Sequence, residues 1–185
     1  SDSAAVDEVY KTFCPDSSIA RAVAYFPART VIAAKALPMG ALVQIEAVVS
    51  HGDGTPPQEV EDRHGLIIEA NNTDAAPKNP LSTQTVAFSH YNHLSAQLPM
   101  DARTGKIVAG GIKEQTAQCL KNIKAIIESV DHKMEDVVKV NVFLKNIDDI
   151  AAVDEVYTEF FPGGVPARRV VGVSSILEGA AIQID

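Results

Sequence analysis

Apolar side chains between Gly111 and Val130 recur every three or four residues, which is the spacing of an α-helix with one buried face. Apolar and polar residues then alternate over 137–144, a pattern that predicts a strand. A second stripe at helical spacing follows Asp148, a residue suited to cap a helix, and Pro162 ends it. Short apolar runs predict further strands at 66–70, 85–88, 93–98, 167–173 and 180–185.

Polar turns are predicted at 89–92 and at 100–106, where Gly105 lies among charged residues. The elements therefore run in the order strands, helix, strand, helix and two strands. This order favours an α+β fold in which two helices pack on one face of a mixed sheet.

Part of the pattern occurs twice along the chain. The sequence AAVDEVY is found at 4–10 and again at 151–157. The segment PARTVIAAKALPMGALVQIE at 27–46 matches PARRVVGVSSILEGAAIQID at 166–185 in its spacing. Repetition of a helix followed by two strands predicts two copies of one domain in tandem.

The repeat predicts three parts of the chain. Residues 1–49 would be the C-terminal part of a first copy, and 66–185 a nearly complete second copy. Between them, 50–65 is rich in Gly, Pro and charge and is interpreted as a linker. A helix and two strands cannot close a core alone. Either the chain is a fragment of a longer tandem protein, which is the preferred interpretation, or the half copy docks on the complete copy or on a neighbouring chain.

Composition narrows the classes of function. The hydrophobic fraction of 46% over 185 residues is sufficient for a core. The formal net charge of −8, with no local cluster of Lys and Arg, repels phosphate backbones, so we expect no nucleic-acid partner. No apolar run has the length of a membrane span and the first residues lack a signal-peptide pattern, so no membrane partner is expected.

Cysteine and histidine give no sign of a metal site. Cys14 and Cys119 are too few for a disulfide framework or a zinc site, which favours a reducing compartment and a cytoplasmic location. His90 and His93 have an H-x-x-H spacing, but they lie at a predicted turn with no Cys, Asp or Glu nearby. We interpret them as exposed turn residues.

Several ordered motifs resemble one known family. They are AQLPMDARTGKIVAGGIKEQTAQCLKNIKAIIE at 96–128, DVVKVNVFLKNIDDIAAVDEVYTEFFP at 136–162, the PAR motif, and GALVQIEAVV at 40–49. Together they resemble the RidA family, also called YjgF and often labelled endoribonuclease L-PSP. The resemblance implies a chorismate-mutase-like fold that forms trimers, with ligand clefts between subunits. It also implies hydrolysis of 2-iminobutanoate and 2-iminopropanoate to 2-keto acids and ammonia, with no cofactor.

The resemblance also implies site residues. The signature arginine of PAR falls on Arg29 and on Arg168, and its planar guanidinium suits a substrate carboxylate. The glutamate of the last strand falls on Glu46, while the second copy has Asp185 there; such a carboxylate suits activation of the attacking water. Ser95, in SAQ where the family usually has SGQ, would line the cleft.

Three positions depart from the family pattern. Leu81 replaces the tyrosine of the cleft, and Val170 replaces the small cysteine after PAR. Asp154, with Asp7 in the first copy, replaces an asparagine often found in the second helix. Because of these departures, the better-preserved Arg29 and Glu46 are predicted to carry the chemistry if the copies share clefts.

Simpler interpretations stay open beside these. The two arginines would then end strands at the surface, and the carboxylates would lie on a polar strand face. For the whole protein, hydrolytic deamination of 2-imino acids is the first hypothesis, and a non-catalytic small-carboxylate binding or assembly module is the second. An endoribonuclease rests on the family label alone, and the negative charge disfavours it.

Overall fold

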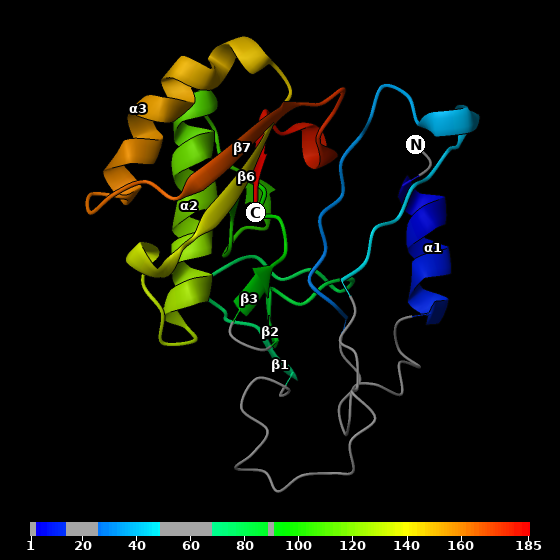
Figure 1. Cartoon of the computed structure of the whole chain (residues 1–185), viewed down its shortest axis with the longest axis horizontal. Helices are drawn as coiled ribbons and strands as arrows, with labels where there is room; N and C mark the ends of the chain where they lie inside the picture. Colours follow the sequence, from blue (N-terminus) through cyan, green and yellow to red (C-terminus); the bar gives the residue numbers. More distant parts are fainter. Residues whose placement is uncertain (1–2, 14–25, 49–67, 89–90) are drawn as a thin grey trace, which may run out of the picture.

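The structure is a computed structural model that describes residues 3–13, 26–48, 68–88 and 91–185. The predicted linker at 50–65, Cys14 and His90 lie outside the described residues. Within the described part, the second repeat forms sheets that two helices cover on one side. The first repeat lies on the other side of these sheets (Figure 1).

The central sheet has the strand order β7-β6-β8. β6 (Lys139–Leu144) pairs in parallel with β7 (Ala167–Gly172) and antiparallel with β8 (Ile182–Ile184). The alternation predicted for β6 is confirmed in part: Val140, Val142 and Leu144 are buried, but Val138, predicted on the same face, is 67% exposed and Phe143, predicted on the other face, is buried. The sheet is therefore mixed, as the order of elements predicts.

A second, antiparallel sheet joins β1 (Ile68–Asn71), β2 (Thr85–Phe88) and β3 (Tyr91–Leu94) in sequence order. The prediction of a turn over 89–92 is wrong at its end, because Tyr91 pairs with Phe88 within the ladder. A hairpin needs only two loop residues, so β3 begins earlier than the hydrophobic pattern suggests. Backbone bonds between Gln97 and Ile184, with N···O distances of 2.7 and 3.1 Å, connect this sheet to β8.

The predicted turn at 100–106 contains a small hairpin of β4 (Met100–Asp101) and β5 (Lys106–Ile107). Its loop is held by Asp101, whose Oδ1 accepts hydrogen bonds from the backbone N–H groups of Arg103 and Thr104 at 3.0 and 2.9 Å. Such a side-chain turn replaces backbone bonds. These bonds hold the pKa of Asp101 below its ordinary value.

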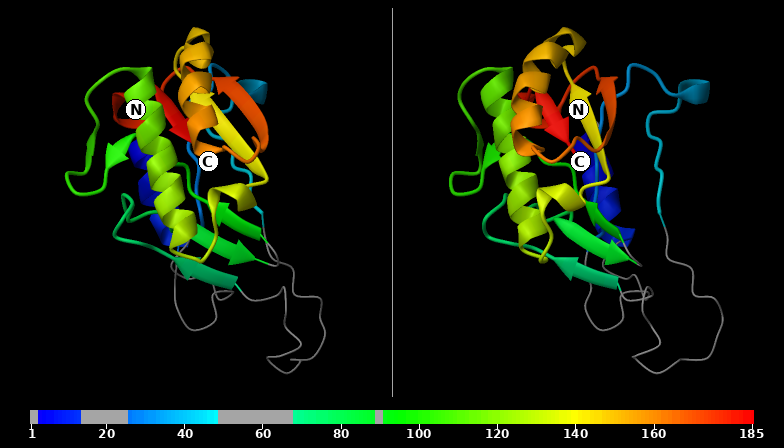
Figure 2. Two further views of the ribbon diagram at one scale, coloured as in Figure 1. Left: turned by 90° about the vertical axis from the view of Figure 1, so that its left-hand side faces the viewer. Right: turned by 60° about the vertical axis from the view of Figure 1, so that its left-hand side comes forward.

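Two helices cover one face of the central sheet, as predicted. α2 (Ile112–Glu128) and α3 (Ile150–Phe160) lie side by side in Figures 1 and 2. The predicted cap is wrong: Asn146, not Asp148, accepts a bond from the Asp148 N–H, and a 3-10 turn, Ile147–Asp149, leads into α3. An asparagine side chain caps this turn as well as an aspartate would.

The apolar faces of these helices and of the central sheet form one core. Its fully or almost fully buried members are Cys119, Leu120, Ile123, Ile127, Met134, Val140, Val142, Leu144, Val153, Tyr157, Phe161, Ile182 and Ile184. Burial raises the pKa of the Cys119 thiol well above its ordinary value, so this cysteine is a core residue, as its place on the helical stripe indicates.

The first repeat keeps its helix but forms no strand ladder within 26–48. α1 (Ser3–Phe13) contains the first AAVDEVY, and a 3-10 turn, Pro38–Gly40, follows an extended stretch. The prediction of two strands here is wrong in that residues 26–48 make only an isolated bridge, between Ala33 and Ser175. In the second repeat the corresponding strands pair with β6, and within the described residues no strand takes that place beside the first repeat.

Candidate functional site

The PAR segment of the first repeat lies against the second repeat. The backbone N–H of Arg29 donates to Ser95 Oγ at 2.8 Å, and the Arg29 carbonyl accepts from the Ala96 N–H at 3.2 Å. Upstream, the Phe26 carbonyl accepts from Thr83 Oγ1 at 2.5 Å. Segments that are distant in sequence therefore meet, and we call residues 26–33 with the side chains they contact the repeat junction.

Ser95 lies at the centre of this contact, and it is only 4% exposed. Its hydroxyl donates to the Thr83 carbonyl at 2.6 Å while it accepts from the Arg29 N–H. A hydroxyl can donate and accept at once, and both bonds are needed at a buried position. Ser95 thus contacts the other repeat directly, and its predicted place in a ligand cleft stays a prediction.

Asp185 also reaches the repeat junction. Its Oδ2 accepts from Thr30 Oγ1 at 2.5 Å, and its Oδ1 accepts from Asn141 Nδ2 at 2.6 Å. The backbone of Asp185 pairs with that of Asn141 on β6, with N···O distances of 2.7 and 3.0 Å. The carboxylate is therefore held in one orientation by groups from both repeats, which suits a base that must meet a water molecule in fixed geometry.

The guanidinium of Arg29 points to α1 of its own repeat. Its Nη2 donates to Asp7 Oδ1 at 2.7 Å, and its central carbon lies 4.4 Å from the ring centre of Tyr10. The Arg29 side chain is only 17% exposed. Ion pairing and stacking on the ring orient the guanidinium, and the bond to Asp7 engages one of its five N–H donors.

Arg168 repeats this geometry in the second repeat. It donates from Nη1 to Asp154 Oδ1 at 2.5 Å and lies 4.9 Å from the ring centre of Tyr157. The departure to aspartate at positions 7 and 154 thus supplies a carboxylate partner for each PAR arginine. The same set of arginine, aspartate and tyrosine is therefore built twice.

The turn before the last segment is also built twice. Met39 and Glu178 both adopt positive φ, at 58° and 56°, and each precedes a glycine with positive φ, at 70° and 72°. Left-handed backbone is rare for residues other than glycine. Its occurrence at matching positions means that the two repeats agree in local backbone as well as in sequence.

Two predicted site residues lie apart from these contacts. Glu46 is exposed on the extended segment 41–48. Leu81 is buried at 9% exposure, and its N–H donates to Asn79 Oδ1 at 2.8 Å. Their predicted roles in catalysis and substrate binding stay predictions.

Three residues at or near the repeat junction carry no motif in the sequence. Thr30 and Asn141 hold the Asp185 carboxylate, as described above. Arg169 on β7 lies opposite Asn141 on β6, and Asn141 pairs with Asp185 on its other side. Arg169, Asn141 and Asp185 therefore share one sheet face. Only the alternation along β7, which sends Arg168 toward α3, could have indicated that Arg169 lies on the opposite face.

Among the described residues no three His, Cys, Asp or Glu side chains lie together as a metal-binding group. No helix in the same part of the chain has the length and apolar character needed to cross a bilayer.

Tyr157 beneath Arg168 carries a buried hydroxyl that has no hydrogen-bond partner among the described residues. Burial raises the pKa of Tyr157, Asp154 raises it further, and Arg168 opposes the rise. The folded state therefore holds the phenolic proton more tightly than the unfolded state. Stability from this group is complete below pH about 10 and is lost as the pH rises through the raised pKa.

Tyr157→Phe is therefore expected to weaken the loss of stability above pH 10. At pH 8 the variant should be as stable as the parent or up to about 1 kcal/mol more stable, because an unpaired buried hydroxyl is removed. Urea unfolding at pH 8 and at pH 10.5 measures both effects. Tyr91→Phe is the matched control, since Tyr91 is 63% exposed; an equal change in both variants would contradict the assignment.

The fold and the repeat junction define a class: an α+β domain with two helices on a mixed sheet and a polar site where separate segments meet. Residues 72–185 match the family model described as Endoribonuclease L-PSP. The chain belongs to this family, and its second repeat has the chorismate-mutase-like fold of RidA proteins.

Relatives agree with this assignment. A RutC family protein of Pyrococcus horikoshii is 43% identical over 115 residues, which are 61% of this chain and 90% of that protein. A 2-iminobutanoate/2-iminopropanoate deaminase of Dermatophagoides farinae is 39% identical over 109 residues, 59% of this chain and 84% of that protein. Among solved structures, the YjgF gene product of E. coli superimposes with a TM-score of 0.60 at 32% identity, covering 63% of this chain and 94% of that one.

Proposed function

We propose that this chain hydrolyses small 2-imino acids to 2-keto acids and ammonia at the repeat junction. The observation that carries the proposal is the hydrogen bond from the backbone N–H of Arg29 to Ser95, beside the bond from the Thr30 side chain to Asp185. These bonds join the PAR segment of the first repeat to two residues of the second repeat that the family resemblance implies. Relatives named 2-iminobutanoate/2-iminopropanoate deaminase, at 39% and 34% identity, support the same reaction.

The chemistry needs a carboxylate anchor and a base. In the proposed reaction, Arg29 binds the substrate carboxylate through N–H donors beyond the one that Asp7 engages. Asp185 takes a proton from water as the water oxygen bonds to the carbon of the protonated C=NH2+ group, which gives a neutral carbinolamine. Asp185 then returns this proton to the nitrogen. As the C–N bond breaks, the hydroxyl group gives its proton to Asp185, so the C=O bond of the 2-keto acid forms and ammonia departs; Asp185 finally releases the proton to the ammonia, which leaves as ammonium.

Arg29→Ala is expected to lower kcat/KM for 2-iminobutanoate about tenfold or more, because a charge-assisted anchor is lost. The substrate is generated in situ, and its disappearance above the rate in buffer is followed. Arg103→Ala is the matched control, since the Arg103 side chain is 89% exposed on the β4–β5 turn. Arg169→Ala tests the second arginine near Asp185.

The outcomes separate the candidate functions. An unchanged rate in Arg29→Ala, with a loss in Arg169→Ala, would move the anchor to the other arginine. Tight binding of a 2-keto acid by calorimetry without turnover would favour the binding module instead. The predicted trimer and cytoplasmic location stay predictions.

A further inference from the structure

The last segment of the first repeat exposes apolar side chains whose counterparts in the second repeat are buried. Val43 and Ile45 are 44% and 77% exposed, whereas the corresponding Ile182 and Ile184 of β8 are 0% exposed. Figure 2 (right) shows the segment running apart from the sheet that contains β8. The same sequence pattern is thus covered in one repeat and open in the other.

The helix of the first repeat shows the same contrast. None of the residues of α1 is buried, and Val9 and Phe13 are 59% and 74% exposed. In α3, by comparison, Val153 and Tyr157 are 0% and 2% exposed, whereas the corresponding Val6 and Tyr10 of α1 are half-buried. Figure 1 shows α1 on the opposite side of the molecule from α2 and α3.

The second repeat shows what covers these faces. β6 pairs with β8, placing Leu144 opposite Ile182 and Val142 opposite Ile184. α2 packs against α3 in the same core. One helix and one strand together, residues 112–144, therefore bury what the first repeat leaves open.

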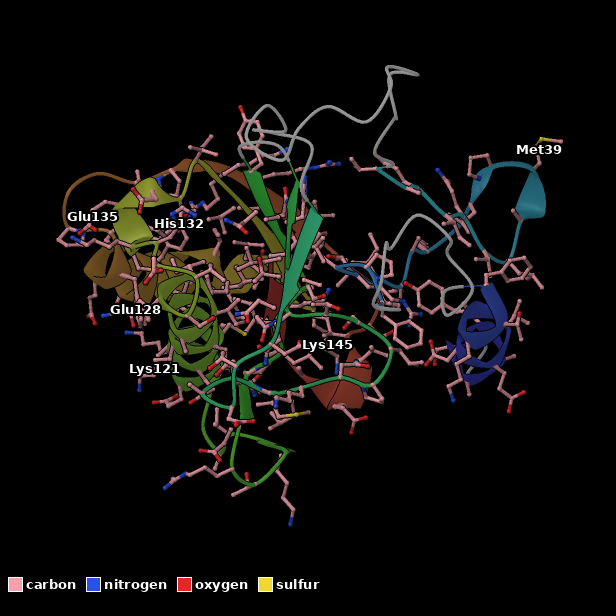
Figure 3. The ribbon with its side chains drawn as sticks, turned by 90° about the horizontal axis from the view of Figure 1, so that it is seen from below. Met39, Lys121, Glu128, His132, Glu135 and Lys145 are labelled. Atoms are coloured by element: carbon pink, nitrogen blue, oxygen red, sulfur yellow. The ribbon has the colours of Figure 1, made fainter. Side chains whose placement is uncertain are left out.

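The open face of the first repeat has the local geometry of the covered one. Its arginine, aspartate and tyrosine meet as they do in the second repeat, and the turn at Met39 has the same backbone angles as that at Glu178. Met39 projects away from the body of the molecule in Figure 3. The face is therefore shaped before any partner binds it, which lowers the cost of docking.

We propose that α1 and residues 41–48 form a docking face for a partner polypeptide that supplies a helix–strand unit like residues 112–144. The strand of the partner would pair with 43–45 and its helix would pack on Val6, Val9 and Phe13. A second copy of this chain does not fit, because its own unit is already covered by α3 and β8. This inference is independent of the proposed function.

A fusion tests the proposal with a defined probe. Residues 66–150 are placed directly before Ala4, and because AAVDEVY follows in both repeats, the junction reproduces the native sequence of 150–157. Amide hydrogen exchange is compared with that of the unextended chain. Exchange in α1 and at 43–45 is expected to slow at least about 100-fold, while α2 and β6 keep their protection.

Two controls keep the test decisive. The same fusion with Val142→Asp in the added segment should show no slowing in α1, because the added strand can no longer join an apolar core. Fast exchange in α1 of the intact fusion, with the second repeat still protected, would overturn the proposal. So would a dimer of the unextended chain in sedimentation that Ile45→Asp dissociates, because a second copy would then be the occupant.

Discussion

Replacing Ile184 with alanine is expected to lower the free energy of unfolding by about 3 kcal/mol, whereas Ile45→Ala should lower it by less than about 0.5 kcal/mol. The two isoleucines occupy the same place in QID and QIE. Ile184 is fully buried against β6 and α2, so its truncation leaves a cavity, while Ile45 is 77% exposed. Urea unfolding followed by circular dichroism measures both values.

Ile184→Val provides a graded control, with an expected loss of about 1 kcal/mol, since only one methylene group is removed. An equal loss in Ile45→Ala and Ile184→Ala would contradict the structure, because it would mean that the segment 41–48 is buried in solution. The comparison is informative because local sequence is held nearly constant and only the surroundings differ.

The regular elements of the second repeat could be predicted because their side chains face one core. The stripe from Ile112 to Ile127 follows the helical period, and α2 buries it. Along β6, Val140 and Val142 follow the period of two for the same reason, but Phe143 is buried as well, so both faces are covered at the end of this strand. The apolar pattern predicts an element best where the core covers one face of it.

Short elements were harder to predict, because their geometry depends on polar contacts that produce no periodic pattern in the sequence. The β4–β5 hairpin is two residues long on each side and is held by the Asp101 side chain. The 3-10 turn that leads into α3 is capped by Asn146 rather than by Asp148, although both residue types cap helices. Asparagine and aspartate have similar propensities to cap a helix or turn, so only the three-dimensional fold decides which of the two residues makes the capping bond.

The repeat junction shows a second reason why the sequence alone does not predict the whole site. The family resemblance points to Arg29, Ser95 and Asp185 separately. The bonds from Arg29 to Ser95 and from Thr30 to Asp185 depend on how the first repeat docks on the second. Thr30 and Asn141 belong to no sequence motif. They contribute to the site only because the Asp185 carboxylate lies within hydrogen-bond distance of both. Long-range docking of this kind has no local signature in one sequence.

The two copies of AAVDEVY separate what sequence decides from what surroundings decide. Both form helices, since the same residues have the same propensity and the same apolar stripe. Tyr157 is nevertheless buried in the core, whereas the corresponding Tyr10 is only partly buried. The local sequence fixes the helix, and the neighbouring α2 determines its burial.

Asp185→Asn is expected to lower kcat for 2-iminobutanoate by about 100-fold or more, because the proposed base can no longer accept a proton from water. The substitution keeps the shape of the side chain. Its oxygen can accept from Asn141 and its amide can donate to the Thr30 hydroxyl, so both contacts of the carboxylate are retained. The thermal unfolding midpoint should therefore change little, and KM should change less than kcat.

Glu46→Gln tests the alternative carboxylate by the same assay. Glu46 is exposed on the segment 41–48, so its substitution is expected to change kcat less than twofold in this chain. A large loss in Glu46→Gln with full activity in Asp185→Asn would assign the base to the first repeat. Loss in Asp185→Asn alone would place it at the repeat junction, where the carboxylate is fixed by groups from both repeats.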